Sequence, residues 1–486
     1  MDSPLTPSHR ALQMDDLEFR QLCEQIAAIA AEHLQQLDTR RIAVAEPGSE
    51  IERIFAGPLP EAGAKQEALQ ALRDVVRYSR AQNGRFLGYV LGSGEAAAAA
   101  ADLLGSVLNQ NVTAWRSAPA AVTLEHLVVG WLAEAIGCAG FSGSLAGGGS
   151  AANLMALAMA RETKAPANEA GISSAGALAV YASTEVHMSI GKALSLLGMG
   201  RQNLRLIPVD DRFRMIPAQL QQAMARDANR GVTPVAVVAS AGTVNTGAVD
   251  PLEEIAGLAK KFAAWFHIDG AYGALGAIAS PEKFAGLDHA DSISLDPHKW
   301  LYQPIDCGCL LYRDAAAARK TFSQSGDYVK ALSGDATESF TFFDESMELS
   351  RRFRALKLWF SLRYHGLRAF RECIANDMRH AEKLAAKIQD NPLFRLRAPV
   401  ELSAVCFQYV GSDETPAGQL DEWNNAILRR VIERGRIYLS NATINSRFCL
   451  RACFVNHRTS DADVESICPE VLQAAREVLG TAAQNP

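Results

Sequence analysis

One lysine stands between a histidine and a tryptophan, directly after a short predicted strand. In SLDPHKWLYQP, which covers residues 294–304, Lys299 follows Pro297 and His298 and precedes Trp300. An ammonium group is costly to remove from water, so an isolated lysine at a strand end usually keeps its charge at the surface. A lysine in a partly dry site near other cations has a lowered pKa and can attack a carbonyl carbon. Lys299 is therefore a candidate for covalent chemistry.

Three further stretches place polar groups at strand ends or helix starts. GSLAGGGSAANLMALAMAR leads through Gly149 and Ser150 into a predicted helix, whose first backbone N–H groups would form an anion site. STEVHMSIGKAL places His187 between a strand and a helix, and FHIDGAYGALG places Asp269 at the end of a strand. Each feature alone fits a tight turn, a helix cap or a turn former. Together with Lys299 they make a phosphate cradle, a flat imidazole, an acid for a ring nitrogen and an amine, the set that holds pyridoxal phosphate (PLP) as a Schiff base.

These residues need a sheet that brings strand ends together. Between residues 95 and 360, short apolar runs alternate with helical segments, which is typical of a largely parallel sheet covered by helices on both faces. In such sheets ligands bind beyond the carboxyl ends of the strands. Within this region, Asp250 is predicted to cap a helix that starts at Pro251. The clearest predicted strands are ALAVYAS, PVAVVASAG, WFHID, SISLD and CGCLLYR.

The chain of 486 residues is too long for one ordinary core, and three parts are predicted. Residues 1–94 form an N-terminal helical segment, residues 95–360 a large PLP-binding α/β domain, and residues 361–486 a small C-terminal α/β domain that begins with a long helix. The first part contains an amphipathic helix whose apolar face needs a second surface, which could belong to another subunit. The residues of that face are Phe19, Leu22, Ile26, Ile29 and Leu37.

Composition argues against several classes of partner. The net charge is −6 and no run of Lys or Arg resembles a nucleic-acid arm, so we expect no nucleic-acid partner. No stretch reaches membrane-span length, and the first residues do not read as a secretory signal. Nine cysteines without a CxxC pair argue against a disulfide framework and a zinc site, so we expect no metal and a cytoplasmic location. Cys307 and Cys309 could form a redox pair, although packing as small hydrophobes is favoured.

The sequence around Lys299 resembles the signature of the group II PLP-dependent amino-acid decarboxylases, the family of aromatic-L-amino-acid, histidine and glutamate decarboxylases. Further similar stretches, TAWRSAPAAVTLE, ELSRRFRALKLWF and LRACFVNHRTSDADVE, extend the likeness over nearly the whole chain. The resemblance implies PLP fold type I, the aspartate aminotransferase-like α/β fold, and a PLP-dependent carboxy-lyase. It also implies a homodimer with the active site at the interface. The residues that match the signature are Ser292, Ile293, Lys299, Trp300, Leu301, Ile305, Cys307, Leu310 and Arg313.

The resemblance also implies a role for individual residues. Lys299 would form the Schiff base with PLP, and Asp269 would pair with the protonated ring nitrogen of the cofactor. His187 would stack on one face of the cofactor ring. The other implied contacts are Gly149, Ser150 and His298 at the phosphate, Ala271 on the second ring face and Thr243 near the polar edge.

The substrate and its pocket are less defined. An aromatic L-amino acid is the default, although Asn111 and Thr113 stand where aromatic decarboxylases carry bulky apolar residues. By position, the candidates for the substrate pocket are Phe86, Tyr89 and Trp115, or these rings belong to the core.

The product depends on one loop position. In aromatic decarboxylases a loop tyrosine is assigned the proton that replaces the carboxyl group, and counting back without gaps from Arg351 puts that position at Phe342. Phenylalanine has no proton to give, and a similar replacement in some plant relatives yields aldehyde, ammonia, carbon dioxide and hydrogen peroxide. His187 or a water could supply the proton instead. Amine formation is favoured, aldehyde formation is the alternative, and a non-catalytic scaffold is a remote third possibility.

Overall fold

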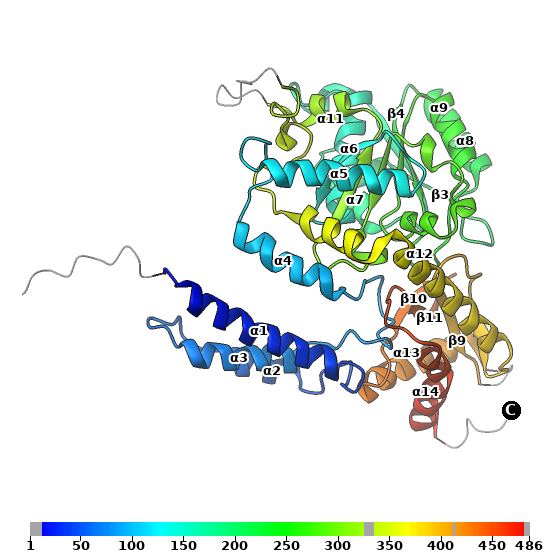
Figure 1. Cartoon of the computed structure of the whole chain (residues 1–486). Helices are drawn as coiled ribbons and strands as arrows, with labels where there is room; N and C mark the ends of the chain where they lie inside the picture. Colours follow the sequence, from blue (N-terminus) through cyan, green and yellow to red (C-terminus); the bar gives the residue numbers. More distant parts are fainter. Residues whose placement is uncertain (1–11, 325–334, 412–414, 481–486) are drawn as a thin grey trace, which may run out of the picture.

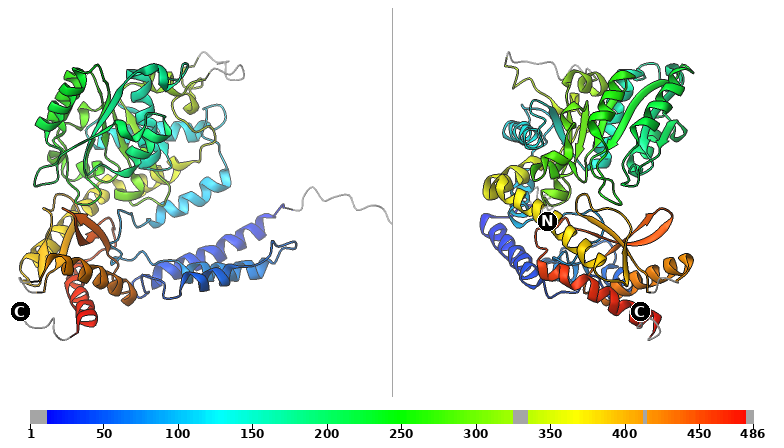
Figure 2. Two further views of the ribbon diagram at one scale, coloured as in Figure 1. Left: turned by 180° about the vertical axis from the view of Figure 1, so that it is seen from behind. Right: turned by 90° about the vertical axis from the view of Figure 1, so that its right-hand side faces the viewer.

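The computed structural model describes residues 12–324, 335–411 and 415–480 (Figure 1). Its N-terminal segment is an arm of helices, of which α1 and α3 run side by side and extend away from the rest of the chain (Figure 2). None of the three arm helices has a buried residue, as expected of an apolar face that awaits a partner. The arm helices are α1 (Asp16–Gln36), α2 (Gly48–Phe55) and α3 (Lys65–Tyr78).

A seven-stranded sheet forms the centre of the large domain. Its strand order is β1-β7-β6-β5-β4-β2-β3, and β7 is antiparallel to both of its neighbours while the remaining pairs are parallel. This arrangement confirms the predicted α/β fold with a mostly parallel sheet, and each of the five predicted runs overlaps a strand. The strands are β1 (Ser142–Ala146), β2 (Leu178–Ser183), β3 (Leu204–Ile207), β4 (Thr233–Ser240), β5 (Trp265–Asp269), β6 (Ser292–Leu295) and β7 (Gly308–Tyr312).

Helices cover both faces of this sheet, and in several strands successive residues belong to two different apolar clusters. In β4, for example, Val237 belongs to one cluster and Val238 to the other. The cluster of Val238 is closed by α6 (Gly149–Lys164), α7 (Met188–Leu196) and α11 (Ala315–Phe322). The cluster of Val237 is closed by α4 (Ala96–Leu108), α5 (Pro119–Ala135), α8 (Pro217–Ala228), α9 (Leu252–Lys261) and α12 (Arg354–Gln389).

The small domain is built on an antiparallel sheet of order β10-β11-β9-β8. Helices α13 (Ala417–Arg434) and α14 (Asp461–Leu479) pack on it together with the second half of α12, which bends at Gly366, where φ is 75°. Helix α12 runs through residue 360 without a break there. The domain boundaries at 94 and 360 stay predictions. The strands are β8 (Phe394–Leu396), β9 (Ala404–Tyr409), β10 (Ser440–Ile444) and β11 (Arg447–Cys453).

Two local predictions are wrong. Asp250 does not cap α9: Pro251 is the cap residue, and the Asp250 carboxylate accepts hydrogen bonds from the backbone of Met215 and Ser240 at 2.6 and 2.8 Å. This buried carboxylate bonds the N–H groups of those two neighbouring segments and not those at the start of α9. Burial raises the pKa of Asp250 to about 6. The long helix begins at Arg354 rather than near residue 361.

Two classes of feature were not found among the described residues. None of their helices combines the length and the apolar character needed to cross a bilayer. No group of three or more His, Cys, Asp or Glu side chains in these ranges is arranged to hold a metal ion.

Candidate active site

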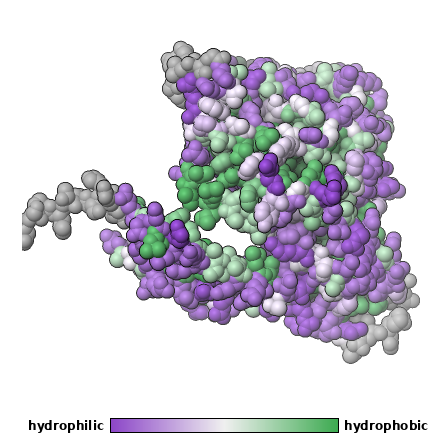
Figure 3. Space-filling model, in the orientation of Figure 1, coloured by the Kyte–Doolittle hydropathy of each residue, from purple (hydrophilic) through white to green (hydrophobic). Residues whose placement is uncertain are grey.

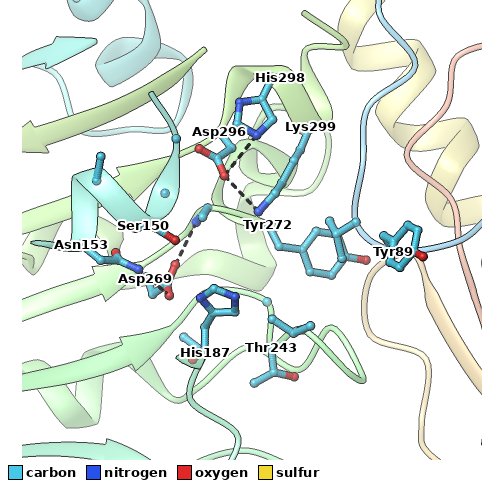
Figure 4. Close-up of a pocket in the computed structure, with 18 of the residues that line it drawn as sticks. Tyr89, Ser150, Asn153, His187, Thr243, Asp269, Tyr272, Asp296, His298 and Lys299 are labelled. Carbon is cyan, nitrogen blue, oxygen red and sulfur yellow. Dashed lines mark hydrogen bonds and ion pairs between the residues drawn. The ribbon is translucent and has the colours of Figure 1, made fainter. Parts of the chain in front are cut away.

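A cavity of about 580 Å³ opens at the carboxyl ends of β2, β4, β5 and β6 (Figure 4). The start of α6, Tyr89 from the N-terminal segment and Arg451 from β11 complete its wall. Because parallel strands end at one edge of the sheet, residues far apart in the sequence face one space. All of the residues predicted to contact PLP line it: Gly149, Ser150, His187, Thr243, Asp269, Ala271, His298 and Lys299.

Lys299 lies on α10 (Pro297–Trp300), a single turn that follows β6. Its Nζ is 3.0 Å from Oδ2 of Asp296, and Nε2 of His298 is 3.5 Å from the same oxygen. Oδ1 of Asp296 is buried and has no hydrogen-bond partner among the described residues. Nδ1 of His298 accepts from the backbone N–H of Cys307 at 3.2 Å, and burial lowers the pKa of the ring. A neutral His298 therefore carries its proton on Nε2, the nitrogen that faces the Asp296 carboxylate.

The turn that carries Lys299 is anchored to α12. Nε1 of Trp300 and the hydroxyl of Tyr302 donate hydrogen bonds of 3.0 and 2.8 Å to Oδ2 of Asp377. Burial raises the pKa of Asp377 to about 7. These bonds fix the backbone just after Lys299, so its position relative to the cavity is set by the core.

The helix start at Gly149 has the form of a phosphate cradle. A Cβ at Gly149 would lie 2.6 Å from Cβ of Ala271 and 3.1 Å from Oδ2 of Asp296, so a larger residue would force its neighbours apart. Free backbone N–H groups and the partial positive charge at the start of a helix favour a phosphate. The hydroxyl of Ser150 adds a donor at the same end of the cavity.

Asp269 and His187 line the same cavity as this cradle (Figure 4). Oδ2 of Asp269 accepts from Nδ2 of Asn153 at 2.9 Å, and Oδ1 accepts from Oγ of Ser294 and the backbone of Ala271 at 3.2 and 3.3 Å. His187 caps α7, and burial lowers the pKa of its ring. A cradle, an amine and a carboxylate thus line one cavity, and these residues fit PLP.

Thr243 turns its hydroxyl toward protein groups. Its Oγ1 is 2.9 Å from Oγ1 of Thr246 and accepts from the backbone N–H of Ala248 at 3.1 Å. This hydroxyl therefore stabilises the turn after β4, even though Thr243 lines the cavity.

Of the three predicted substrate-pocket residues, the structure brings Tyr89 to the cavity of this chain. Phe86 is buried and stacks on Tyr438, with ring centroids 5.0 Å apart. Trp115 packs at the edge of the core and donates from Nε1 to Oγ1 of Thr123 at 3.2 Å. Phe86 and Trp115 are not among the residues that line the cavity.

Phe342 is also away from the cavity. Its side chain is fully buried, 0% exposed, with the Arg351 guanidinium 4.2 Å from the ring centroid and the His126 ring 5.1 Å away. Tyr328, the nearest tyrosine upstream, lies outside the described residues.

The sequence analysis missed several cavity residues, among them the polar or charged Asn153, Glu185, Asp296 and Arg451. Asp296 lies inside the stretch that drew attention to Lys299, so its place could have been inferred. Nε of Arg451 donates to Oγ of Ser440 at 3.2 Å, and burial raises the pKa of Glu185. Arg451 lies in LRACFVNHRTSDADVE, a stretch noted for its resemblance, but nothing local showed that it faces a cavity.

Comparison with known proteins agrees with this geometry. The model of the pyridoxal-dependent decarboxylase conserved domain matches residues 64–410. The aromatic-L-amino-acid decarboxylase of Bacillus atrophaeus is 32% identical over 474 residues, covering 96% of this chain and 97% of that protein. The 4-hydroxyphenylacetaldehyde synthase of Rhodiola rosea is 28% identical over 499 residues, covering 99% of both. The crystal structure of Oryza sativa TDC with PLP and tryptamine has a TM-score of 0.89 at 27% identity, covering 98% of this chain and 99% of that one.

These matches confirm the resemblance first seen around Lys299. They extend from the N-terminal arm to the small domain, so the likeness concerns the whole architecture and not one motif. The chain therefore belongs to the pyridoxal-dependent decarboxylase family, and it is a PLP-dependent carboxy-lyase that decarboxylates an L-amino acid.

Proposed function

We propose that the cavity around Lys299 decarboxylates an aromatic L-amino acid to its amine and carbon dioxide. The observation that carries this proposal is the meeting of Lys299, Asp269, His187 and the glycine-led start of α6 in one cavity. The aromatic substrate class is supported by relatives described as aromatic-L-amino-acid, tryptophan and tyrosine decarboxylases.

In this proposal, different residues of the cavity bind different parts of PLP. PLP, when bound, supplies an electron sink for the electron pair left as the carboxyl group departs. Nζ of Lys299 would hold the cofactor covalently, and the backbone of Gly149 with the hydroxyl of Ser150 and Nε2 of His298 would bind its phosphate. The carboxylate of Asp269 would keep a proton on the ring nitrogen, and His187 would lie against the ring. Ala271 and Thr243 would complete its surroundings.

Arg451 supplies a second cation to the cavity. Its guanidinium is buried, and it is held by Ser440 and by the backbone carbonyl of Val244. We propose that this cation pairs with the carboxylate of the incoming amino acid and orients it, because a preformed guanidinium binds a carboxylate with little loss of freedom. Tyr89 would contact the substrate side chain from the N-terminal segment.

A panel of L-amino acids tests the substrate class. Tryptophan, tyrosine and phenylalanine should give carbon dioxide and amine with higher kcat/KM than glutamate or leucine. A clear preference for glutamate or leucine would contradict the aromatic assignment.

Aldehyde formation is not favoured. The argument for it depends on Phe342 standing at the site of proton transfer, whereas its ring is fully buried among Phe340, His126 and Arg351. Phe342→Tyr should therefore leave the ratio of amine to aldehyde unchanged, while the added buried hydroxyl lowers the unfolding free energy by about 1 to 3 kcal/mol. Amine, aldehyde and peroxide are measured together with thermal unfolding. Phe340→Tyr in the same cluster is the matched control, and a change of product in Phe342→Tyr alone would show that its ring does reach the reaction.

We propose that two copies of the chain form a homodimer. The arm helices bury no side chain, and α4 presents an apolar face that includes Leu104 and Val107, 52% and 54% exposed (Figure 3). A monomer rarely leaves so contiguous an apolar face in water. The double variant Leu104→Glu with Val107→Glu should sediment as a monomer, whereas Leu206→Glu on the far edge strand β3, 55% exposed, should not change the assembly. Sedimentation velocity distinguishes them, and a wild-type monomer would refute the dimer.

We also propose that the chain works in a reducing compartment such as the cytoplasm. All nine cysteines are free, and seven of them are buried. Burial raises the pKa of Cys307 to about 12, so this thiol packs as a small apolar group and is unreactive.

A further inference from the structure

Asn153 lies within α6, one helical turn after Gly149, with its side chain beside Asp269 (Figure 4). It is 1% exposed. Its Nδ2 donates to Oδ2 of Asp269 and to Oγ of Ser189, each at 2.9 Å, and its Oδ1 is 2.9 Å from Nε2 of His267. One amide therefore connects the carboxylate at the cavity to groups behind it.

His267 continues this connection into the core. It is fully buried on β5, two residues before Asp269. Its Nδ1 is 2.9 Å from Oγ of Ser292, and that hydroxyl accepts from Nε1 of Trp265 at 2.8 Å. Burial lowers the pKa of His267 to about 4, so the ring is neutral near neutral pH and carries one proton.

The carboxylate of Asp269 sets the direction of each hydrogen bond in this series, because a carboxylate only accepts. The amide nitrogen of Asn153 must face it, so Oδ1 of Asn153 faces His267 and requires a donor. Nε2 of His267 is that donor, and its Nδ1 accepts from the hydroxyl of Ser292. The carbonyl oxygen of Ser292, 3.2 Å from Nδ1, would pair only with a doubly protonated ring.

The same amide orients one of the two donors that set the tautomer of His187. Oγ of Ser189 receives its hydrogen bond from Asn153 and lies 2.7 Å from Nδ1 of His187. The backbone N–H of Ser189 donates to that nitrogen as well, at 3.2 Å. With two donors on Nδ1, the neutral His187 ring carries its proton on Nε2.

We propose that Asn153, oriented by His267, is a positioning residue that fixes both the Asp269 carboxylate and the Nε2–H form of His187. Oδ2 of Asp269 depends on it most, since the two bonds to Oδ1 are longer, at 3.2 and 3.3 Å. This inference rests on the proposed roles of Asp269 and His187 toward PLP.

Two pairs of variants test the proposal in the holoenzyme. Asn153→Ala should lower kcat by about 10- to 100-fold, as when an outer hydrogen-bond partner of a metal ligand is lost. It should raise KM little, weaken PLP binding to the apo-protein and change the visible absorbance. Its control is Asn424→Ala, an equally buried amide that bonds Tyr409 and Leu420 in the small domain. The control should lower stability and leave kcat and the absorbance near their wild-type values.

The second pair separates positioning from packing. In His267→Gln the amide nitrogen takes the place of Nε2 and can still donate to Asn153, whereas in His267→Asn it reaches only the place of Nδ1. His267→Gln should recover most of the kcat and absorbance that His267→Asn loses. These two His267 variants test the hydrogen bond to Asn153 even if Asn153→Ala does not fold.

Several results would overturn the inference. Equal losses in the two His267 variants would contradict the hydrogen-bond direction. Wild-type kcat and absorbance in Asn153→Ala, beside an inactive Asp269→Asn, would overturn the inference and leave the role of Asp269 intact. Full activity of Asp269→Asn would instead refute the proposed role of Asp269, and the inference with it.

Discussion

Lys299→Ala should abolish covalent attachment of PLP and lower kcat by at least about 10³-fold, the scale seen when an enzyme loses its nucleophile. Lys299 is the lysine that lines the cavity in the described part of the chain, so no neighbouring amine there can replace it. The variant also removes the cation 3.0 Å from Asp296, whose Oδ1 already lacks a partner among the described residues. Borohydride reduction followed by peptide mass spectrometry, together with steady-state kinetics, measures both effects.

The phosphate cradle does not depend on that amine. Lys299→Ala should therefore still bind PLP reversibly through the start of α6, and equilibrium dialysis can detect this. Lys260→Ala, at an exposed lysine on α9, is the matched control and should keep the adduct and the activity. A borohydride-stable adduct in Lys299→Ala would mean that another residue holds the cofactor.

Asp269→Asn should lower kcat by about 10² to 10³-fold and affect KM much less. Asparagine keeps the shape of the side chain but not the negative charge that stabilises a proton on the ring nitrogen, an interaction worth roughly 1.5 to 3 kcal/mol or more in a buried site. The substitution also turns an acceptor of three hydrogen bonds into a group that competes with the Asn153 donor. Steady-state kinetics and the visible absorbance of the holoenzyme follow the loss.

A second buried aspartate provides the comparison. Asp250→Asn removes a carboxylate of similar burial that bonds the backbone of Met215 and Ser240 and does not line the cavity. It should lower the unfolding temperature and leave kcat unchanged. If Asp269→Asn behaved in the same way, the carboxylate at the cavity would be structural.

The sequence was most informative where the order of the strands determines which residues meet. Lys299, Asp269 and His187 each follow a parallel strand, and such strand ends share one edge of the sheet, so their meeting could be predicted without coordinates. Arg451 could not be found in this way, because it reaches the cavity from the other domain. Asn153 resembles an ordinary polar residue on a core helix, and only the hydrogen bonds of its amide reveal its place.

The direction of individual aromatic rings could not be predicted from the sequence. Counting along the chain places Phe86, Trp115 and Phe342 near pocket-forming segments but says nothing about which way each ring points. None of the three rings lines the cavity, and they contact Tyr438, Thr123 and Arg351 respectively. Tyr89, three residues after Phe86, lines the cavity from a backbone with φ of 63° that no local pattern predicted.

The most direct test of the central claim is the product balance of the purified holoenzyme with an aromatic L-amino acid. Carbon dioxide, amine, aldehyde and hydrogen peroxide are quantified from one reaction, with Lys299→Ala as the blank. The arrangement around Lys299 predicts one amine for each carbon dioxide and no peroxide above the blank. Peroxide and aldehyde in step with carbon dioxide, or no carbon dioxide at all, would contradict it.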